Sequence, residues 1–308
     1  GLPVIPPTEE RVEEMLRGTN LPRDHELGRL GSREGLLTVE KLATNAVMAG
    51  CKPIHMPVLV AGAEALVDPR SNSIQISVST GSWAYLWLVN GPIRKQLDVR
   101  SDTGAFGPAF RANRVIARAL GLAYKNTALI HPGEKDMGLI GNPFKYSLFA
   151  GENEERSPFE PYHVTQGFDA EDSTITLGGP RSFVQFVPSE MNADGVLRGM
   201  RYNMIPDMTA IRSDSQNKTV FYMLSPYNAQ ELADAGATAV YLQFDGLRAE
   251  VDTFERRRPP HFLETPPAWS SGTPVRVVHI CGNGPIRKRF VPASAGPLSH
   301  PHLAEELP

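Results

Sequence analysis

The stretch LLTVEKLATNAVMAGCKPIHMPVLVAGAEALV, residues 36–67, organises the first part of the chain, and its pattern predicts two helices that meet at a bend. Thr38 is a good N-cap for the first helix, and apolar residues then recur every three or four positions, as one buried helical face requires. Gly50 stands where a left-handed residue commonly ends a helix. The second helix is expected to begin at Pro53 or Pro57, because proline is tolerated in a first helical turn.

Cys51 lies at this bend, just ahead of the expected second helix. The positive end of a helix dipole and the neighbouring Lys52 favour a thiolate, and His55 is placed to act as a base. These neighbours predict a cysteine nucleophile. The alternative is a buried, inert cysteine packed beside Ala49 and Gly50.

Composition indicates an ordinary soluble globular chain. Its 308 residues are 41% hydrophobic and 21% charged, and the net charge of -3 argues against nucleic acid or an anionic membrane as the main partner. No apolar run is long enough to span a bilayer, and no secretory signal is visible. Two cysteines, Cys51 and Cys281, do not form a disulfide framework, so a reducing cytoplasm is the expected location.

Periodic apolar residues and turn signals predict the remaining elements. Helices are expected over residues 9–17, 108–120, 226–236 and 238–247. Strands are expected over residues 73–79, 174–177, 182–187, 218–224 and 275–280, with 83–89 as a strand or a buried helix turn. Residues 20–34 are expected to be irregular, and Arg111, Arg114 and Arg118 to form a solvated basic row.

One hexapeptide, NGPIRK, occurs twice, at residues 90–95 and at residues 283–288. Each copy follows a short apolar run and stands downstream of an expected helical pair. An identical match of six residues predicts two related halves, residues 36–125 and 218–292, packed about a pseudo-two-fold axis.

Each copy of NGPIRK also has the residues of an anion pocket. A strand end, a glycine turn and a proline at the first helical position would leave free backbone N–H groups beside an arginine. The predicted anion-binding residues are Asn90, Gly91, Arg94, Asn283, Gly284 and Arg287. The alternative is a structural turn in which the arginine pairs with a carboxylate of the other half.

The segment GENEERSPFEPYHV, residues 151–164, brings several glutamates close to a histidine. Prolines stiffen the chain around Glu160 and His163, so these two residues are predicted to move protons in catalysis. The glutamates are also compatible with a metal site, although no HExxH or CxxC pattern supports one. Because no GxGxxG, Walker A or GxSxG motif is present, no cofactor is expected.

The predicted fold class is α/β, with two related subdomains and mixed sheets that arise from a pseudo-two-fold internal duplication. The expected order along the chain is an N-terminal arm (1–35), a first α/β subdomain (36–132), a loop-rich insertion with short strands (133–217), a second α/β subdomain (218–292) and a flexible tail (293–308).

Four segments resemble one bacterial family. GLPVIPPTEERVEEML, TVEKLATNAVMAGCKPIHMPVLVAGAEAL, VNGPIRK and ENEERSPFEPYHV are similar to the GCKP-containing region of the UGSC-family (seleno)proteins. The family often carries a thiol- or selenol-bearing UGSC or CGSC segment, and this chain has none. The resemblance therefore implies that such a segment sits on a separate subunit of a heteromer. It also places Cys51 at a family motif position, and it implies no substrate.

These features together predict an enzyme or enzyme subunit with a cysteine nucleophile, which acts on a small anionic substrate by lyase or sulfur-group transfer chemistry. Cys51 would attack, His55, Glu160 and His163 would move protons, and an arginine would hold the anion. One alternative is a non-catalytic scaffold subunit that binds a thiol- or selenol-bearing partner protein. Another is a metal-dependent enzyme that uses the glutamate-rich segment. An oligomer is expected, and neither nucleic acid nor a membrane is an expected partner.

Overall fold

A computed structural model describes residues 2–181, 183–200 and 221–237, together with the backbone of residues 286–290. The helices are α1 (Glu9–Leu16), α2 (Val39–Ala49), η1 (Pro53–His55), α3 (Met56–Val67), η2 (Pro69–Ser71), α4 (Ser73–Ile76), α5 (Ile93–Gln96), α6 (Arg111–Thr127), η3 (Pro143–Lys145), α7 (Tyr162–Thr165) and α9 (Pro226–Asp234), and residues 193–200 are also helical. The strands are β1 (Glu26–Leu30), β2 (Gly35–Thr38), β3 (Leu86–Asn90), β4 (Phe149–Gly151), β5 (Ser173–Gly178) and β6 (Ile286–Phe290).

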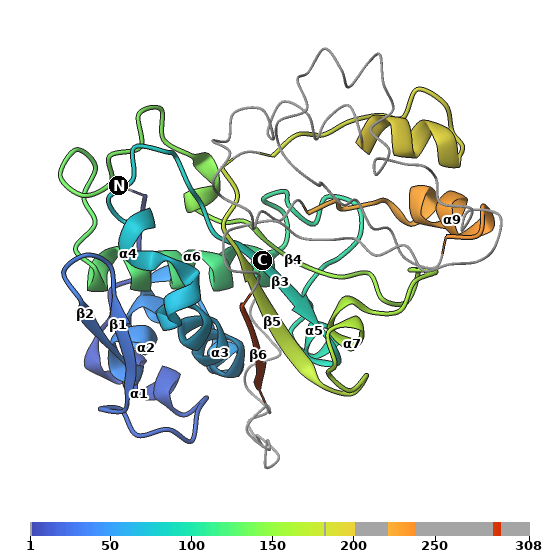
Figure 1. The fold of residues 1–308 in the computed structure, drawn as a ribbon. Helices are drawn as coiled ribbons and strands as arrows, with labels where there is room; N and C mark the ends of the chain where they lie inside the picture. Colours follow the sequence, from blue (N-terminus) through green and yellow to red (C-terminus); the bar gives the residue numbers. More distant parts are fainter. Residues whose placement is uncertain (1, 182, 201–220, 238–285, 291–308) are drawn as a thin grey trace.

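The centre of the fold is a four-stranded mixed sheet with the order β4-β3-β5-β6 (Figure 1). Strand β3 runs parallel to β4 and antiparallel to β5, and β5 is antiparallel to β6. Helix α3 contacts β5 and β6, and α6 contacts β4, so these helices cover one face of the sheet. The α/β class and the mixed sheet agree with the prediction from sequence.

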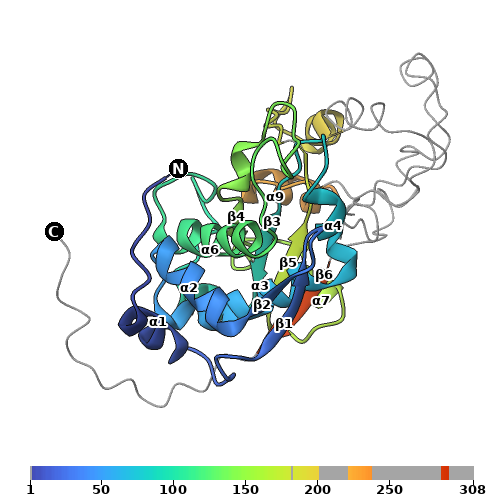
Figure 2. The ribbon, with the colours of Figure 1, turned by 90° about the vertical axis from the view of Figure 1, so that its left-hand side faces the viewer.

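The predicted helical pair is confirmed. The hydroxyl oxygen of Thr38 accepts a hydrogen bond from the N–H of Lys41 at 3.3 Å, and Gly50 ends α2 with a φ of 87°. Pro53 begins the short turn η1, and Pro57 lies in the first turn of α3. Figure 2 shows α2 between α1 and α6, and α2 packs closely against both of them.

Helix α6 buries its predicted apolar side, but its basic side is not simply exposed to solvent as predicted. Ala112, Ile116 and Leu120 are buried, as expected. The basic row on the same helix is not simply solvated: Arg111 donates a hydrogen bond to the carbonyl of Gly50, and Arg118 donates to that of Pro3. Arg114 is half-buried and donates to the carbonyls of Phe106, Ser147, Ala105 and Phe149. These arginines therefore tie loops to the helix, which corrects the prediction.

Several short segments differ from their predicted structure. The region expected to be irregular, residues 20–34, contains β1, which pairs antiparallel with β2 immediately after it. Residues 73–79, expected as a strand, begin with helix α4. The hydroxyls of Ser71 and Ser77 donate to nearby carbonyls, those of Leu66 and Ile74 respectively, both at 2.7 Å. Such local bonds compete with strand pairing. The expected strand over 182–187 does not form over its described residues, 183–187, which have no regular structure.

Helix α9 confirms its predicted start and end. The hydroxyl of Ser225 accepts a hydrogen bond from the N–H of Asn228, and Gly236 follows the helix with a φ of 89°. The predictions for residues 238–247 and 275–280, and for Cys281, fall outside the described part of the chain. No helix within the described ranges is both long and apolar enough to cross a membrane.

The two NGPIRK copies do not have the same structure where both are described. In the first copy, β3 ends at Asn90, Gly91 turns the chain with a φ of 82°, and Ile93 begins helix α5. In the second copy, residues 286–288 belong to strand β6 and pair with β5. The same three residues are therefore helical once and extended once, because strand pairing overrides local preference. The predicted equivalence of the two turns is wrong over these residues.

Candidate functional site

Two groups of residues that were predicted separately meet at one end of the sheet. The first NGPIRK turn follows β3, and the glutamate-rich segment follows β4. Since β3 and β4 are parallel, their carboxyl ends lie at the same edge, where ligands commonly bind in α/β folds. We call the polar and charged residues that meet here the acid cluster: Asn90, Arg94, Lys95, Glu152, Glu154, Glu155 and His163.

Arg94 is the centre of the acid cluster and is only 4% exposed. Its guanidinium donates to both carboxylate oxygens of Glu155 at 3.1 Å, to the carboxylate of Glu154, and to the carbonyl of Glu152 at 2.6 Å. The N–H of Gly91 donates to Oε1 of Glu154 at 2.7 Å. The protein's own carboxylates therefore fill the predicted anion pocket. This corrects the prediction in favour of the structural alternative, with the carboxylates supplied by the segment after β4.

Two carboxyl groups of the acid cluster have pKa values that are shifted in opposite directions, one by hydrogen bonds and the other by burial. The hydrogen bonds from Arg94 lower the pKa of Glu155 to about 2. Burial raises the pKa of Glu152, although its carboxylate accepts hydrogen bonds from Asn90 Nδ2 and, at 2.8 Å, from the N–H of Tyr162. The environment of Glu152 is therefore the less favourable one for a negative charge.

His163 belongs to the acid cluster, but Glu160 does not take part in its contacts. The His163 side chain is 1% exposed, with Nδ1 4.0 Å from Oε1 of Glu154 and Nε2 3.4 Å from the carbonyl oxygen of Ala170. Glu160 is exposed at the surface. Of the two residues of this segment that were predicted to move protons, the structure thus brings only His163 close to a carboxyl group of the acid cluster.

The surroundings of Cys51 oppose the predicted thiolate. Its Sγ donates to the carbonyl of Val115 at 3.3 Å, and burial raises the pKa of the thiol. The turn η1 lies between Cys51 and the N-terminus of α3, so the dipole of that helix begins one turn away from the thiol. Nδ1 of His55 accepts a hydrogen bond from the N–H of Lys52 at 3.2 Å, and burial lowers the pKa of His55 to about 4. The bend therefore holds a protonated thiol beside a histidine that caps the turn.

The side chains of the remaining predicted site residues are not among those that the structure describes. Asn283 and Gly284 lie outside the described residues, and Arg287 is described only as part of the backbone of β6. Within the described ranges, no three histidine, cysteine, aspartate or glutamate side chains are arranged to hold a metal ion. The glutamate-rich segment forms ion pairs with Arg94 and Lys95 instead.

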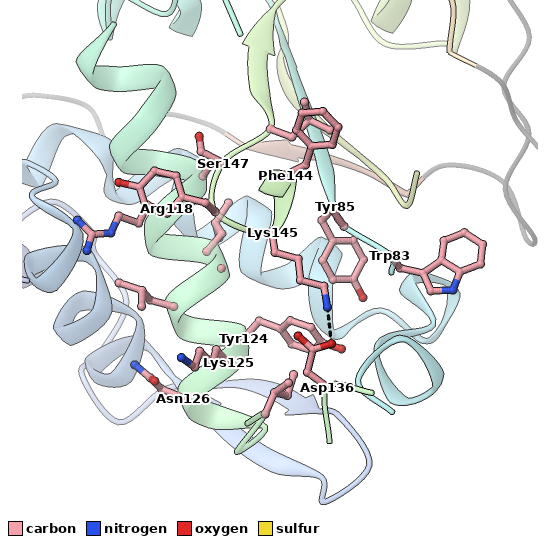
Figure 3. A pocket seen from close by; sticks show the side chains of 18 of the residues that line it. Trp83, Tyr85, Arg118, Tyr124, Lys125, Asn126, Asp136, Phe144, Lys145 and Ser147 are labelled. Carbon is pink, nitrogen blue, oxygen red and sulfur yellow. Dashed lines mark hydrogen bonds and ion pairs between the residues drawn. The ribbon is translucent and has the colours of Figure 1, made fainter. Parts of the chain in front are cut away.

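A cavity of about 480 Å³ lies at the opposite end of β3, between α6 and the segments around residues 83–87, 130–136 and 144–148. Figure 3 shows side chains from these segments converging on it. We call it the aromatic cavity, because it is lined by the rings of Trp83, Tyr85, Trp87, Tyr124, Phe144 and Tyr146.

Hydrogen bonds hold two of these rings in place. The hydroxyl of Tyr124 donates to the carbonyl of Ser73 at 2.6 Å, and that of Tyr85 donates to the carbonyl of Ser71 at 3.3 Å. The two rings meet edge to face, with centroids 5.5 Å apart. Helix α4 and the turn before it therefore fix one wall of the aromatic cavity.

Charged groups also line the aromatic cavity, and most of them are positive. The lining includes three cations, Arg118, Lys125 and Lys145, and one acid, Asp136. Nζ of Lys145 lies 2.5 Å from Oδ1 of Asp136, and a dashed line marks this ion pair in Figure 3. Lys125 is exposed and forms no ion pair with any residue that the structure describes. Neither Cys51 nor His55 lines the cavity.

The predictions from sequence missed the aromatic cavity. Trp83, Tyr85 and Trp87 stand at alternate positions and all three line the cavity, so this alternation of aromatic residues is the signal that could have marked a shared surface. The rest of the lining comes from α6 and from the segment around η3, which are separated from it in sequence.

The chain matches none of the family models, curated proteins or solved structures with which we compared it. The resemblance to the UGSC family therefore stays a prediction, and the function has to be inferred from the geometry.

Proposed function

We propose that this protein binds a small aromatic anion in the aromatic cavity. The observation that carries the proposal is the combination of ring-lined walls with an excess of positive side chains around one space of about 480 Å³. Small-molecule sites typically have volumes of about 300–1,000 Å³, with mostly apolar walls and a few polar groups that orient the ligand.

The walls favour a planar ligand. Tyr85 contacts both Tyr124 and Trp87, with ring centroids 5.5 Å and 6.0 Å away. Because the hydroxyls of both tyrosines are bound to backbone carbonyls, these rings are preorganised. Rigid aromatic walls lose little side-chain entropy when a flat ring packs against them.

The charges favour an anion. Three cations and one carboxylate line the cavity, so an unliganded cavity carries excess positive charge. Lys145 already has a partner in Asp136, whereas Lys125 has none among the described residues, which makes Lys125 the best group to pair with a carboxylate. The small anionic substrate expected from the sequence is thus kept as a proposal, but at a different place and without the cysteine nucleophile.

Calorimetric titration with 2-naphthoate and with its uncharged analogue 2-naphthamide tests the proposal. We expect 2-naphthoate to bind more tightly, and we expect Tyr124→Ala to weaken both ligands because it removes a wall. Lys95→Met is the matched control, since Lys95 is an exposed lysine at the other end of β3. Equal affinity for the acid and the amide, or full binding by a correctly folded Tyr124→Ala variant, would reject the proposal.

A further inference from the structure

The charges that line the aromatic cavity do not cancel. Nζ of Lys145 lies 2.5 Å from Oδ1 of Asp136, so this cation and this acid neutralise each other. Arg118 and Lys125 remain, and neither forms an ion pair with a residue that the structure describes. The cavity therefore has two positive charges left over, one more than a ligand with a single carboxylate would balance.

The two unpaired cations stand on one side of α6. They are seven residues apart, close to two full turns, so their side chains start from the same face of the helix, about 10 Å apart along its axis. Gly121, Leu122 and Tyr124 lie between them in the sequence and also line the cavity. Figure 3 shows Arg118 and Lys125 near opposite ends of this stretch of the helix. A ligand that lies along this face would meet one cation at each end.

The guanidinium of Arg118 lies at the rim of the aromatic cavity. Its Cζ is 5.5 Å from the ring centroid of Tyr146, and it donates a hydrogen bond to the carbonyl of Pro3. Tyr146 lines the cavity, and so do Leu2 and Val4 on either side of Pro3. The charged group of Arg118 is therefore held between two parts of the cavity wall.

The present hydrogen-bond acceptor of Arg118 is neutral and can be replaced. A carboxylate is a better partner than a carbonyl for a guanidinium, because hydrogen bonds between charged groups are roughly twice as strong as neutral ones. The segment that supplies the carbonyl has no regular secondary structure, and Leu2 and Val4 are 61% and 44% exposed. A ligand carboxylate can thus take the place of the Pro3 carbonyl without disrupting a helix or a strand.

We infer that the ligand of the aromatic cavity is an aromatic dianion, with one carboxylate at Lys125 and a second one at Arg118 in place of the Pro3 carbonyl. This inference rests on the proposed function, because it names the class of aromatic anion that the cavity binds. The rings of the ligand lie between its two charges, as the ring-lined wall lies between the two cations. A ligand with one carboxylate would leave Arg118 with only its neutral acceptor.

Calorimetric titration with naphthalene-2,6-dicarboxylate and with its monomethyl ester tests the inference. Both compounds have the same two rings, but the ester carries one charge fewer. We expect the dicarboxylate to bind the wild type about three- to fivefold more tightly, as one partly exposed ion pair implies. Equal affinities would overturn this inference alone, whereas a failure of both compounds to bind would reject the proposed function with it.

Variants locate the second charge. Arg118→Gln keeps a donor for the Pro3 carbonyl but removes the charge, so we expect it to bind the dicarboxylate and the ester with similar affinity. Arg118→Lys keeps the charge and should keep most of the preference. Arg11→Met is the matched control, because Arg11 donates to the carbonyl of Pro6 in the same N-terminal segment and does not line the cavity. A full preference in a correctly folded Arg118→Gln variant would contradict the inference.

NMR of the wild type provides a readout that needs no variant. The side-chain Nε–H signal of Arg118 is expected to shift as the dicarboxylate is added, because its acceptor changes from a carbonyl to a carboxylate. A signal that stays in place at saturating dicarboxylate would overturn the inference, since the second carboxylate would then not reach Arg118.

Discussion

The two ends of β3 are both rich in functional groups, but they differ in how those groups are satisfied. At the carboxyl end, Arg94 is buried, and the carboxylates of Glu154 and Glu155 accept hydrogen bonds from its two terminal nitrogens. At the amino end, the aromatic cavity is open, and Lys125 is exposed without an ion pair among the described residues. A basic motif is therefore not enough to indicate an anion site, because the fold itself can supply the anion.

Removing the buried cation Arg94 is the strongest test of this difference between the two ends of β3. Arg94→Met is expected to lower the free energy of unfolding by about 3–5 kcal/mol, because it leaves the largely buried carboxylate of Glu154 without its charged partner. Urea denaturation measures the loss. Lys95→Met should lower it by less than about 1 kcal/mol, since the pair that Lys95 forms with Glu155 is exposed. Similar losses in the two variants would mean that the carboxyl end is not a closed ion-pair network.

A reactive Cys51 would move the functional centre away from both ends of β3. Because burial raises the pKa of this thiol, we expect iodoacetamide to alkylate the native protein at Cys51 at least about tenfold more slowly than a free cysteine at pH 8. Peptide mass spectrometry after timed quenching follows the reaction at Cys51 itself. Alkylation as fast as that of free cysteine at pH 7 would restore the nucleophile predicted from sequence.

Binding at the amino end depends on an unpaired cation. Lys125→Met is expected to weaken 2-naphthoate binding about two- to fivefold, as the loss of one exposed charge pair implies, and to leave 2-naphthamide binding unchanged. Calorimetry measures both affinities. An equal loss for the acid and the amide would show that Lys125 acts through packing rather than charge.

Acid should weaken the carboxyl end through Glu155. A carboxyl group whose pKa is lowered by folding stabilises the protein above its unfolded pKa of about 4.5, and this contribution disappears as the pH falls toward about 2. Because Glu155 is partly exposed, we expect the contribution to be about 0.5 kcal/mol. Urea denaturation at several pH values should show a smaller decrease for Glu155→Gln than for the wild type. Identical decreases would remove Glu155 from the network.

Local signals predicted the local structure well. Thr38, Gly50 and the two prolines at the bend act within one helical turn, so their effect on α2, η1 and α3 can be derived from the sequence alone. The strand expected over residues 73–79 failed because an alternating pattern does not reveal that serine hydroxyls bond to nearby carbonyls. The second NGPIRK copy failed because its pairing with β5 is a long-range contact.

The candidate site was predictable only in part for the same reason. The basic turn and the glutamate-rich segment were each recognised, but their pairing depends on β3 and β4 lying parallel, which brings Arg94 to residues about 60 positions later in the chain. The aromatic cavity depends on how α6 packs beside residues 83–87, and no spacing within one segment expresses that contact.

A titration of labelled protein with 2-naphthoate, followed by NMR, asks directly which end of β3 receives a ligand. The side-chain N–H signals of Trp83 and Trp87 report on the aromatic cavity, and that of Arg94 reports on the acid cluster. We expect the tryptophan signals to shift with ligand concentration while the Arg94 signal stays in place. A shift at Arg94 with both tryptophan signals unmoved would contradict the assignment of the ligand site to the aromatic end.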